Sequence, residues 1–286
     1  MDDTSKELFA LRKAAFAKGD KAVLEQVGEG KDIMSILLNA NMHSTESDRL
    51  TDEELVAQMS TMLFAGTDTT SNALARTLHL LSMHPDVQER LRDEIIQAAD
   101  TYGQDIPYEQ LFELPFLDAV CRETLRVDMP LNFIVRETVG DSVLPLHQAI
   151  TGIDGTPIHE IAVPKGTMVL VALAACNRSR AVWGEDALEW KPERWLSALP
   201  ETVGQARVPG VYSNLMTFSG GGRSCIGFRF SQLEMKVVLA VLLQHFRFSL
   251  TDKKIVWNFS GIHFPSMHTD GTTPSLILKV QPLREE

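Results

Sequence analysis

The residues best suited to binding or catalysis lie in segment 218–227, which reads FSGGGRSCIG. Three consecutive glycines let the backbone adopt positive φ values and approach a flat ligand closely. Cys225 comes just before a predicted helix, whose positive dipole end and free N–H groups favour the thiolate over the thiol. A thiolate can ligate iron or act as a nucleophile, and Arg223 can hold an anionic group.

The same segment has a second interpretation, a glycine loop that holds a phosphate at the N-terminus of the following helix. The lysine and the serine or threonine of a P-loop are missing, however, and Cys225 then has no role. Spacing alone leaves the thiolate site and the phosphate loop equally open.

A second chemical segment, residues 65–70, reads AGTDTT in the middle of a long apolar stretch. Hydroxyl and carboxylate groups inside a helix compete with its backbone hydrogen bonds and tend to bend it. Gly66 removes a side chain and opens space against one face. The segment therefore predicts a notch where a small ligand sits beside an acid and an alcohol that handle protons. A solvated polar stripe is the alternative, and the six residues alone favour it.

Two further segments carry charges at suggestive spacings. Glu123 and Arg126 are three residues apart and share one helix face, where a surface pair contributes about 0.2–0.5 kcal/mol. Arg194, in segment 192–195 (PERW), could join them in a buried network, which spacing cannot establish.

Composition narrows the class of protein. The 286 residues are 44% hydrophobic and 23% charged, which is typical of a globular chain and excludes disorder and collagen-like repeats. A formal net charge of −11 argues against a general attraction to nucleic acid or anionic lipid. The three cysteines are widely spaced, which excludes a disulfide framework and a CxxC zinc site and fits a reducing compartment. Residues 1–21 lack the apolar core of a signal peptide, and no apolar run approaches the ~20 residues of a membrane span.

The elements expected to position these segments are mostly helices. A capping box at Thr51–Glu54 opens a long helix over 52–83, and His84-Pro85 ends it. Other helices are predicted at 7–17, 33–40, 86–99, 115–126 and 226–244. Short strands are predicted at 133–138, 142–144, 158–163, 168–171, 246–250, 255–257 and 275–280, with a loop over 177–212. The predicted class is α+β, dominated by helix.

Taken together, the four segments resemble the cytochrome P-450 haem-thiolate monooxygenases, in the same order and at about the same separations. Segment 218–227 resembles the haem-binding loop and is complete at its defining positions, and segment 65–70 resembles the oxygen-activating helix. The pair Glu123 and Arg126 is similar to the ExxR pair, and residues 192–194 are similar to the PERF-type segment. The details look most like fungal members. The resemblance implies a mainly α fold with small β-sheets, as a single truncated domain over residues 1–286.

The resemblance implies a set of haem-binding residues. Cys225 would be the proximal ligand of the iron of haem b, and its thiolate would favour O–O cleavage. Phe218 would lie against the haem near that sulfur, and Gly227 closes the loop. Arg223 and Arg136 would pair with the propionates.

Further roles follow from the same resemblance. Asp68 and Thr69 would be the acid and alcohol that deliver protons to the dioxygen activated by the haem. Glu123, Arg126 and Arg194 would form a structural network behind the haem. Breaking such a network is costly, because it leaves an unpaired buried charge. The remaining cysteines, Cys121 and Cys176, are expected to be inert core residues.

The implied activity is insertion of one oxygen atom of O₂ into a small, lipophilic organic substrate, with electrons from an NADPH-dependent reductase and no nucleic acid partner. Arg229 and Lys236 could form a basic patch for an acidic electron donor, although solvated helix charge is the simpler interpretation of each. The alternatives are a truncated haem-binding remnant without independent catalysis and the phosphate-binding glycine loop.

The first residues of the chain correspond to the later half of the family pattern. We therefore expect a truncated gene product, a fragment or an incomplete gene model, lacking the N-terminal anchor and the helices that supply much of the substrate pocket. Full-length relatives are typically bound to the endoplasmic reticulum membrane, whereas this chain shows no anchor, which leaves the cytoplasm open as its location.

Overall fold

The structure, a computed structural model, describes residues 6, 7, 9–11, 13, 14, 32–267, 271 and 273–283. The chain divides into two compact units, Met1–Asp68 and Thr69–Glu286, with the boundary inside helix α4. The described residues between 6 and 14 are helical, which agrees with part of the helix predicted at 7–17; the rest of that prediction lies outside the described residues.

In the first unit, two helix starts are fixed by side-chain caps. Helix α3 (Ile33–Met42) begins after Asp32, whose carboxylate accepts from the Ser35 backbone N–H at 3.0 Å. Helix α4 (Asp52–Met83) begins with the predicted capping box: Thr51 N–H donates to Glu54 Oε2 at 2.8 Å, and Glu54 N–H donates to Thr51 Oγ1 at 3.3 Å. The buried hydrophobic side chains among the described residues of this unit are Phe9, Leu38, Leu55, Val56 and Met59.

Helix α4 has the bounds that the sequence predicts, and it continues unbroken through residues 65–70. It ends before His84-Pro85, and Pro85 takes the first position of helix α5 (Pro85–Tyr102), where a missing N–H costs nothing. The polar residues of segment 65–70 therefore do not interrupt the helix, and their side chains do not displace its backbone hydrogen bonds.

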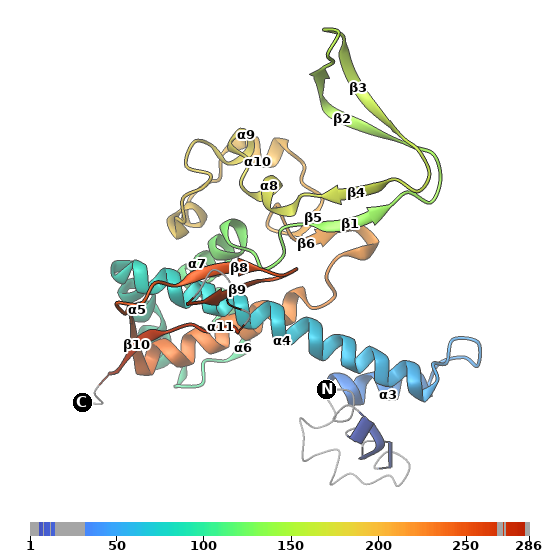
Figure 1. The fold of residues 1–286 in the computed structure, drawn as a ribbon. Helices are drawn as coiled ribbons and strands as arrows, with labels where there is room; N and C mark the ends of the chain where they lie inside the picture. The colour runs from blue at the N-terminus through green and yellow to red at the C-terminus, as the bar shows by residue number, and fades with distance from the viewer. Residues whose placement is uncertain are drawn as a thin grey trace. The chain divides into compact units, whose positions relative to one another are not determined.

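The core of the second unit is built by α5, α7 (Pro115–Val127) and α11 (Phe228–His245), which pack against one another (Figure 1). Leu91, Ile95, Leu117, Leu239 and Leu243 are fully buried among them. Helix α6 (Tyr108–Glu113) and the short helices α8 (Leu173–Asn177), α9 (Arg180–Trp183) and α10 (Glu201–Gln205) lie around this core, with 3₁₀ turns η2 (Pro192–Leu196) and η3 (Gly221–Arg223).

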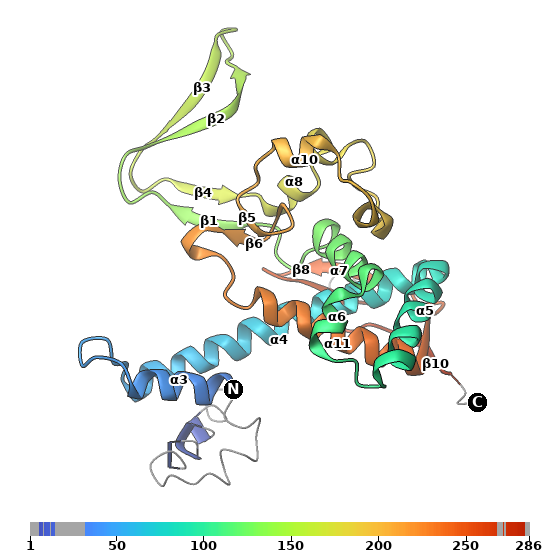
Figure 2. The same cartoon turned by 180° about the vertical axis from the view of Figure 1, so that it is seen from behind.

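The strands described in this unit form five two-stranded antiparallel pairs. They are β1 (Ile134–Glu137) with β4 (Met168–Val171), β2 (Ser142–Thr151) with β3 (Pro157–Val163), β5 (Gly210–Tyr212) with β6 (Leu215–Gly220), β7 (Phe246–Leu250) with β10 (Leu278–Pro282), and β8 (Val256–Phe259) with β9 (His263–Ser266). Helices therefore dominate and the sheets are small, as predicted. The β2–β3 hairpin points away from the helices in both views (Figures 1 and 2).

Three predictions about this unit need correction. The loop predicted over 177–212 contains α9, η2, α10 and β5. Strand β2 runs on to Thr151, well beyond the predicted end at residue 144, because Pro145 is accommodated at a register shift of the hairpin. Strands β6 and β9 were not predicted. Within the described residues, no helix has the length and apolar character needed to cross a bilayer.

Candidate functional site: a pocket between the cysteine loop and helix α4

The cysteine loop connects β6 to α11 and is shaped by glycines. A Cβ atom at Gly220 would lie 2.1 Å from the Pro209 carbonyl oxygen, so that position requires glycine. Gly221 has φ +69°, a conformation that favours glycine. The Cys225 N–H then donates to the Phe218 carbonyl at 2.9 Å, which closes the loop and fixes the cysteine before α11. The Cys225 side chain is exposed.

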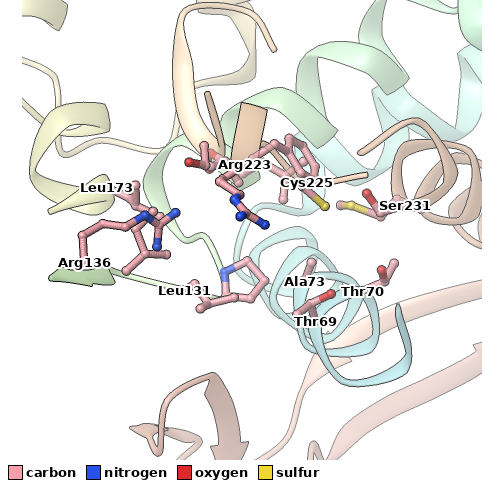
Figure 3. Close-up of a pocket in the computed structure, with 16 residues that line it drawn as sticks. Thr69, Thr70, Ala73, Leu131, Arg136, Leu173, Arg223, Cys225 and Ser231 are labelled. Carbon is pink, nitrogen blue, oxygen red and sulfur yellow. The ribbon is translucent and has the colours of Figure 1, made fainter. Parts of the chain in front are cut away.

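This loop forms one wall of a pocket of about 230 Å³. In Figure 3, Cys225 and Ser231 lie on one side of the space, and Thr69 and Ala73 of α4 lie on the opposite side. The rest of the lining is largely apolar and comes from α7, β1, the segment between them, α8, β6 and α11: Leu125, Pro130, Leu131, Ile134, Leu173, Thr217, Phe218, Ser219 and Met235. An apolar space with a few polar groups at its edges is typical of a cofactor or substrate site.

Two arginines add positive charge to the pocket. Arg223, at the end of η3, and Arg136, on β1, both line it, and both are exposed (Figure 3). Neither forms an ion pair with a carboxylate of the described residues; Arg136 donates only to the carbonyl of Val135, at 2.9 Å. Two guanidinium groups without acidic partners can bind the carboxylates of a ligand with charge-assisted hydrogen bonds.

The α4 wall carries one hydroxyl with an unusual environment. Thr70 is only 2% exposed, and its Oγ1 is buried without a hydrogen-bond partner among the described residues. Thr77 and Ser82 on the same helix instead donate to the carbonyl four residues earlier, at 2.9 and 2.8 Å. Thr69 is half-buried and also lines the pocket.

The structure brings together most of the predicted site residues. Those that line the pocket are Cys225, Phe218, Arg223, Arg136 and Thr69. Gly227 does not line it. It is the N-cap residue of α11, and a Cβ atom added there would lie at an ordinary 3.9 Å from Cys225 Sγ. Asp68 is the last residue of the first unit and is exposed.

Several lining residues were not predicted as site residues. They include Thr70, Leu131, Leu173, Ser231 and Met235. Helical spacing marks residues such as Met235 as buried, but it carries no signal that separates the wall of a pocket from ordinary core. These residues line a pocket only because α4 lies opposite the cysteine loop.

Beneath the loop lies the predicted charge network. The Glu123 carboxylate accepts from Arg126 Nε and Nη2, both at 2.8 Å, and from Arg194 Nε at 3.3 Å. Glu123 and Arg126 are fully buried, and Arg194 is 9% exposed. Trp195 Nε1 also donates to Glu123, at 2.9 Å. A hydrogen bond from Arg194 lowers the pKa of Asp186, which extends the network to the surface. Glu123 and Arg126 therefore belong to a buried network, and the contribution of about 0.2–0.5 kcal/mol made by an exposed helix pair does not apply to them.

The network also holds the pocket wall. Arg126 Nη1 donates to the carbonyls of Asn177 and Ala187, at 3.0 and 2.6 Å. The Asn177 side chain in turn accepts from the Met216 N–H at 2.7 Å and donates to Thr217 Oγ1 at 2.8 Å. The strand that leads into the cysteine loop is thus tied to α7 through buried polar groups, which supports a positioning role for the network.

The basic patch that Arg229 and Lys236 could form is absent, and the simpler interpretation as solvated helix charge is wrong for Lys236. Lys236 is fully buried and pairs with Asp118 at 2.8 Å, because its position on α11 faces the core. Arg229 is exposed. Of the other cysteines, Cys121 is fully buried, and burial raises its pKa to about 12, as expected for an inert thiol. Cys176 is half-buried, and burial raises its pKa as well.

The donor set of the pocket indicates a particular kind of ligand. Among the described residues no group of three histidine, cysteine or acidic side chains could hold a metal ion. The pocket lining has two sulfur atoms, in Cys225 and Met235, and only the Cys225 thiol can become an anionic thiolate donor. A metal held there therefore needs a flat chelating ligand for its other positions. Such a ligand, with carboxylates that reach the two arginines, fits this lining.

Comparison with known proteins gives a family match and several similar proteins. The family model described as Cytochrome P450 matches residues 1–266. The chain is 57% identical over 286 residues to "Ganoderic acid synthetase CYP5150L8" of Ganoderma lucidum, covering 99% of this chain and 52% of that protein. It is 58% identical over 284 residues to "Cytochrome P450 monooxygenase 91" of Postia placenta, again covering 99% and 52%.

A solved structure is similar as well. The crystal structure of a cytochrome P450, CYP102L1, superimposes with a TM-score of 0.69 at 27% identity, covering 98% of this chain and 55% of that one. The chain thus spans about half the length of the curated relatives it matches.

Proposed function

The chain belongs to the cytochrome P450 family, and we propose that it binds haem b through Cys225 and acts as a haem-thiolate monooxygenase. The reaction inserts one oxygen atom of O₂ into a small organic substrate and reduces the other to water. The observation that carries the proposal is the pocket itself, in which an exposed cysteine and two arginines, without ion-pair partners among the described residues, surround a largely apolar space.

Each element of the pocket has a role in this proposal. The Cys225 sulfur would hold the iron, and Arg136 and Arg223 would bind the two propionates. Phe218 would pack against the haem, and its side chain is already in contact with Tyr212 and Phe228, with ring centroids at 5.6 and 6.1 Å. When bound, the haem supplies the redox chemistry and the activation of dioxygen.

Proton delivery falls to helix α4. We assign Asp68 as the acid that takes protons from solvent, since its side chain is exposed. Thr69 lines the pocket and passes a proton on through its Oγ1 hydroxyl, which can donate and accept at once. The substrate would be a small lipophilic organic molecule, as the resemblance implies.

Electrons would come from an NADPH-dependent reductase. The resemblance places full-length relatives at the endoplasmic reticulum membrane. Lys236 plays no part in docking, since it is buried.

The test is the ferrous–carbon monoxide difference spectrum of the purified chain after haem reconstitution. We expect a strongly red-shifted Soret band, which reports thiolate ligation, and its loss in Cys225→Ala. Cys176→Ala, which removes a half-buried cysteine outside the pocket lining, is the matched control and keeps the band. A band of the histidine-ligated type in the unchanged protein, or an unchanged band in Cys225→Ala, would contradict the assignment.

A second function, a haem-binding module without catalysis of its own, is favoured by one observation. On α11 and the loop before it, the apolar side chains Ile226 and Phe230 are 88% and 61% exposed. So much uncovered apolar surface beside a pocket that must exclude water calls for a further segment or partner. Turnover with a peroxide as surrogate oxidant separates the two functions: product formation supports the monooxygenase, and a normal spectrum without product supports the module.

A further inference from the structure

We propose that Ser231 is a positioning residue for Cys225: its hydroxyl donates a hydrogen bond to the cysteine sulfur when that sulfur ligates iron, and so limits how much electron density the sulfur gives to the metal. This inference rests on the proposed function. It concerns a residue that carries no motif and that the sequence did not mark.

The position of Ser231 in α11 brings it back to the cysteine loop. Helix α11 starts at Phe228, so Ser231 is the fourth helical residue. A side chain at this position reaches back towards the chain that enters the helix, which is why it commonly packs against the residue before the N-cap. Here that residue, Ile226, is 88% exposed and does not occupy the space. Ser231 and Cys225 instead both line the pocket, on the same side of it (Figure 3).

The hydroxyl of Ser231 makes one hydrogen bond, which it can give up for a bond to another acceptor. Its Oγ donates to the Phe228 carbonyl, three residues earlier, at 3.1 Å. That carbonyl is also the acceptor of the helical N–H four residues later, so it keeps a partner when Ser231 turns away. A hydrogen bond to a thiolate is charge-assisted and stronger than one to a neutral carbonyl. Formation of the thiolate therefore favours rotation of the hydroxyl from Phe228 to Cys225.

Besides Ser231, the hydroxyls of Ser219, Thr217, Thr69 and Thr70 line the pocket, and the three threonines are less suited to this role. Thr217 is held on both sides, since it donates to the Leu125 carbonyl at 2.7 Å and accepts from Asn177 at 2.8 Å. Thr69 and Thr70 belong to α4, across the space from the cysteine (Figure 3).

Hydrogen bonds to a ligating sulfur reduce its donation to the metal and raise the reduction potential of the site. In Ser231→Ala we therefore expect a lower ferric/ferrous reduction potential and a ferrous–carbon monoxide Soret band at longer wavelength than in the unchanged protein. Ser231→Thr keeps the hydroxyl and should keep both values. Ser224→Ala is the matched control, because Ser224 is next to Cys225 in the chain but does not line the pocket.

The outcomes separate this inference from the proposed function. If the unchanged protein gives no thiolate-type band, the ligand assignment fails. If that band is present but Ser231→Ala leaves both the potential and the band unmoved, the inference about Ser231 is wrong and the proposed function stands. A shift of equal size in Ser224→Ala would also overturn it, since the effect would then not depend on position in the pocket. A shift in Ser231→Ala alone, restored in Ser231→Thr, supports it.

Discussion

Replacing Glu123 by glutamine tests whether the buried network stabilises the fold as its geometry indicates. The carboxylate accepts hydrogen bonds from Arg126, Arg194, Trp195 and the Lys191 N–H, at 2.8 to 3.3 Å, with no solvent exposure. Glutamine removes the negative charge and turns an amide N–H₂ towards these donors. Since breaking one side of a buried ion pair costs about 3–5 kcal/mol, we expect the free energy of unfolding to fall by that amount.

The measurement is urea denaturation of the haem-free chain at neutral pH, followed by circular dichroism. With a denaturant slope of about 2 kcal/mol per molar, the midpoint should fall by about 1.5–2.5 M. Glu193→Gln is the matched control: Glu193 pairs with Arg90 at 3.1 Å, but the two side chains are 44% and 51% exposed, so the loss should stay below about 1 kcal/mol.

A milder variant keeps the test open if Glu123→Gln does not fold. Trp195→Phe removes the indole N–H bond to Glu123, which as a bond to a charged group contributes about 1.5–3 kcal/mol, and it trims the ring that packs against Trp183. The expected order of loss is Glu123→Gln, then Trp195→Phe, then Glu193→Gln. If Glu123→Gln loses no more stability than Glu193→Gln, burial does not make this network costly to break, and the reasoning is refuted.

Three further predictions follow from single sites. Iodoacetamide should label the exposed Cys225 rapidly, whereas the buried Cys121, whose pKa is raised to about 12, should be labelled only after unfolding. Mass spectrometry of the labelled peptides gives the order, and early labelling of Cys121 would contradict its burial. Thr70→Val should stabilise the haem-free chain by about 1 kcal/mol, because it removes a buried hydroxyl without a partner; a lower urea midpoint would show that the hydroxyl is bonded. Burial, and to a smaller extent the charge of Arg76, lowers the pKa of His79, and its neutral Nδ1 accepts a hydrogen bond from Trp257 Nε1 at 2.9 Å. Below about pH 6.5 the unfolded chain takes up a proton at this histidine that the folded chain does not. The free energy of unfolding should therefore fall as the pH is lowered through this range. His79→Asn, which keeps an acceptor but does not titrate, should reduce that slope in unfolding experiments between pH 5 and pH 7, and an unchanged slope would contradict the assignment.

Much of the helical framework could be predicted from sequence, because local chemistry decides where helices begin and end. The capping box and the proline fix both ends of α4, and Pro115 starts α7. The β5–β6 hairpin was missed because its turn consists of Ser213 and Asn214, with φ of 52° and 58°. A turn of that type is usually recognised by glycine, which is absent here.

For the site, sequence reasoning predicted the residues whose chemistry is unusual in itself. Cys225 and Arg223 stand in a glycine-rich loop, whereas Arg136 was identified only through the family resemblance. The lining contributed by Leu131 and Leu173 could not be predicted, since it depends on how loops far apart in the chain meet. The spacing of Glu123 and Arg126 could not distinguish a surface pair from a buried one, because burial comes from the chain segments around η2 that cover them.

The β2–β3 hairpin has a consequence for how the molecule opens. Both strands are exposed along nearly their whole length, and they pair only with each other. A lone two-stranded hairpin is marginally stable in water, so its backbone amides should exchange with solvent deuterium long before those of α7 or α11. Opening of the hairpin is then independent of the core. Its turn, at Gly152 to Gly155, is accordingly where a protease should cut first and where an inserted peptide or fluorescent tag should leave the cysteine pocket intact.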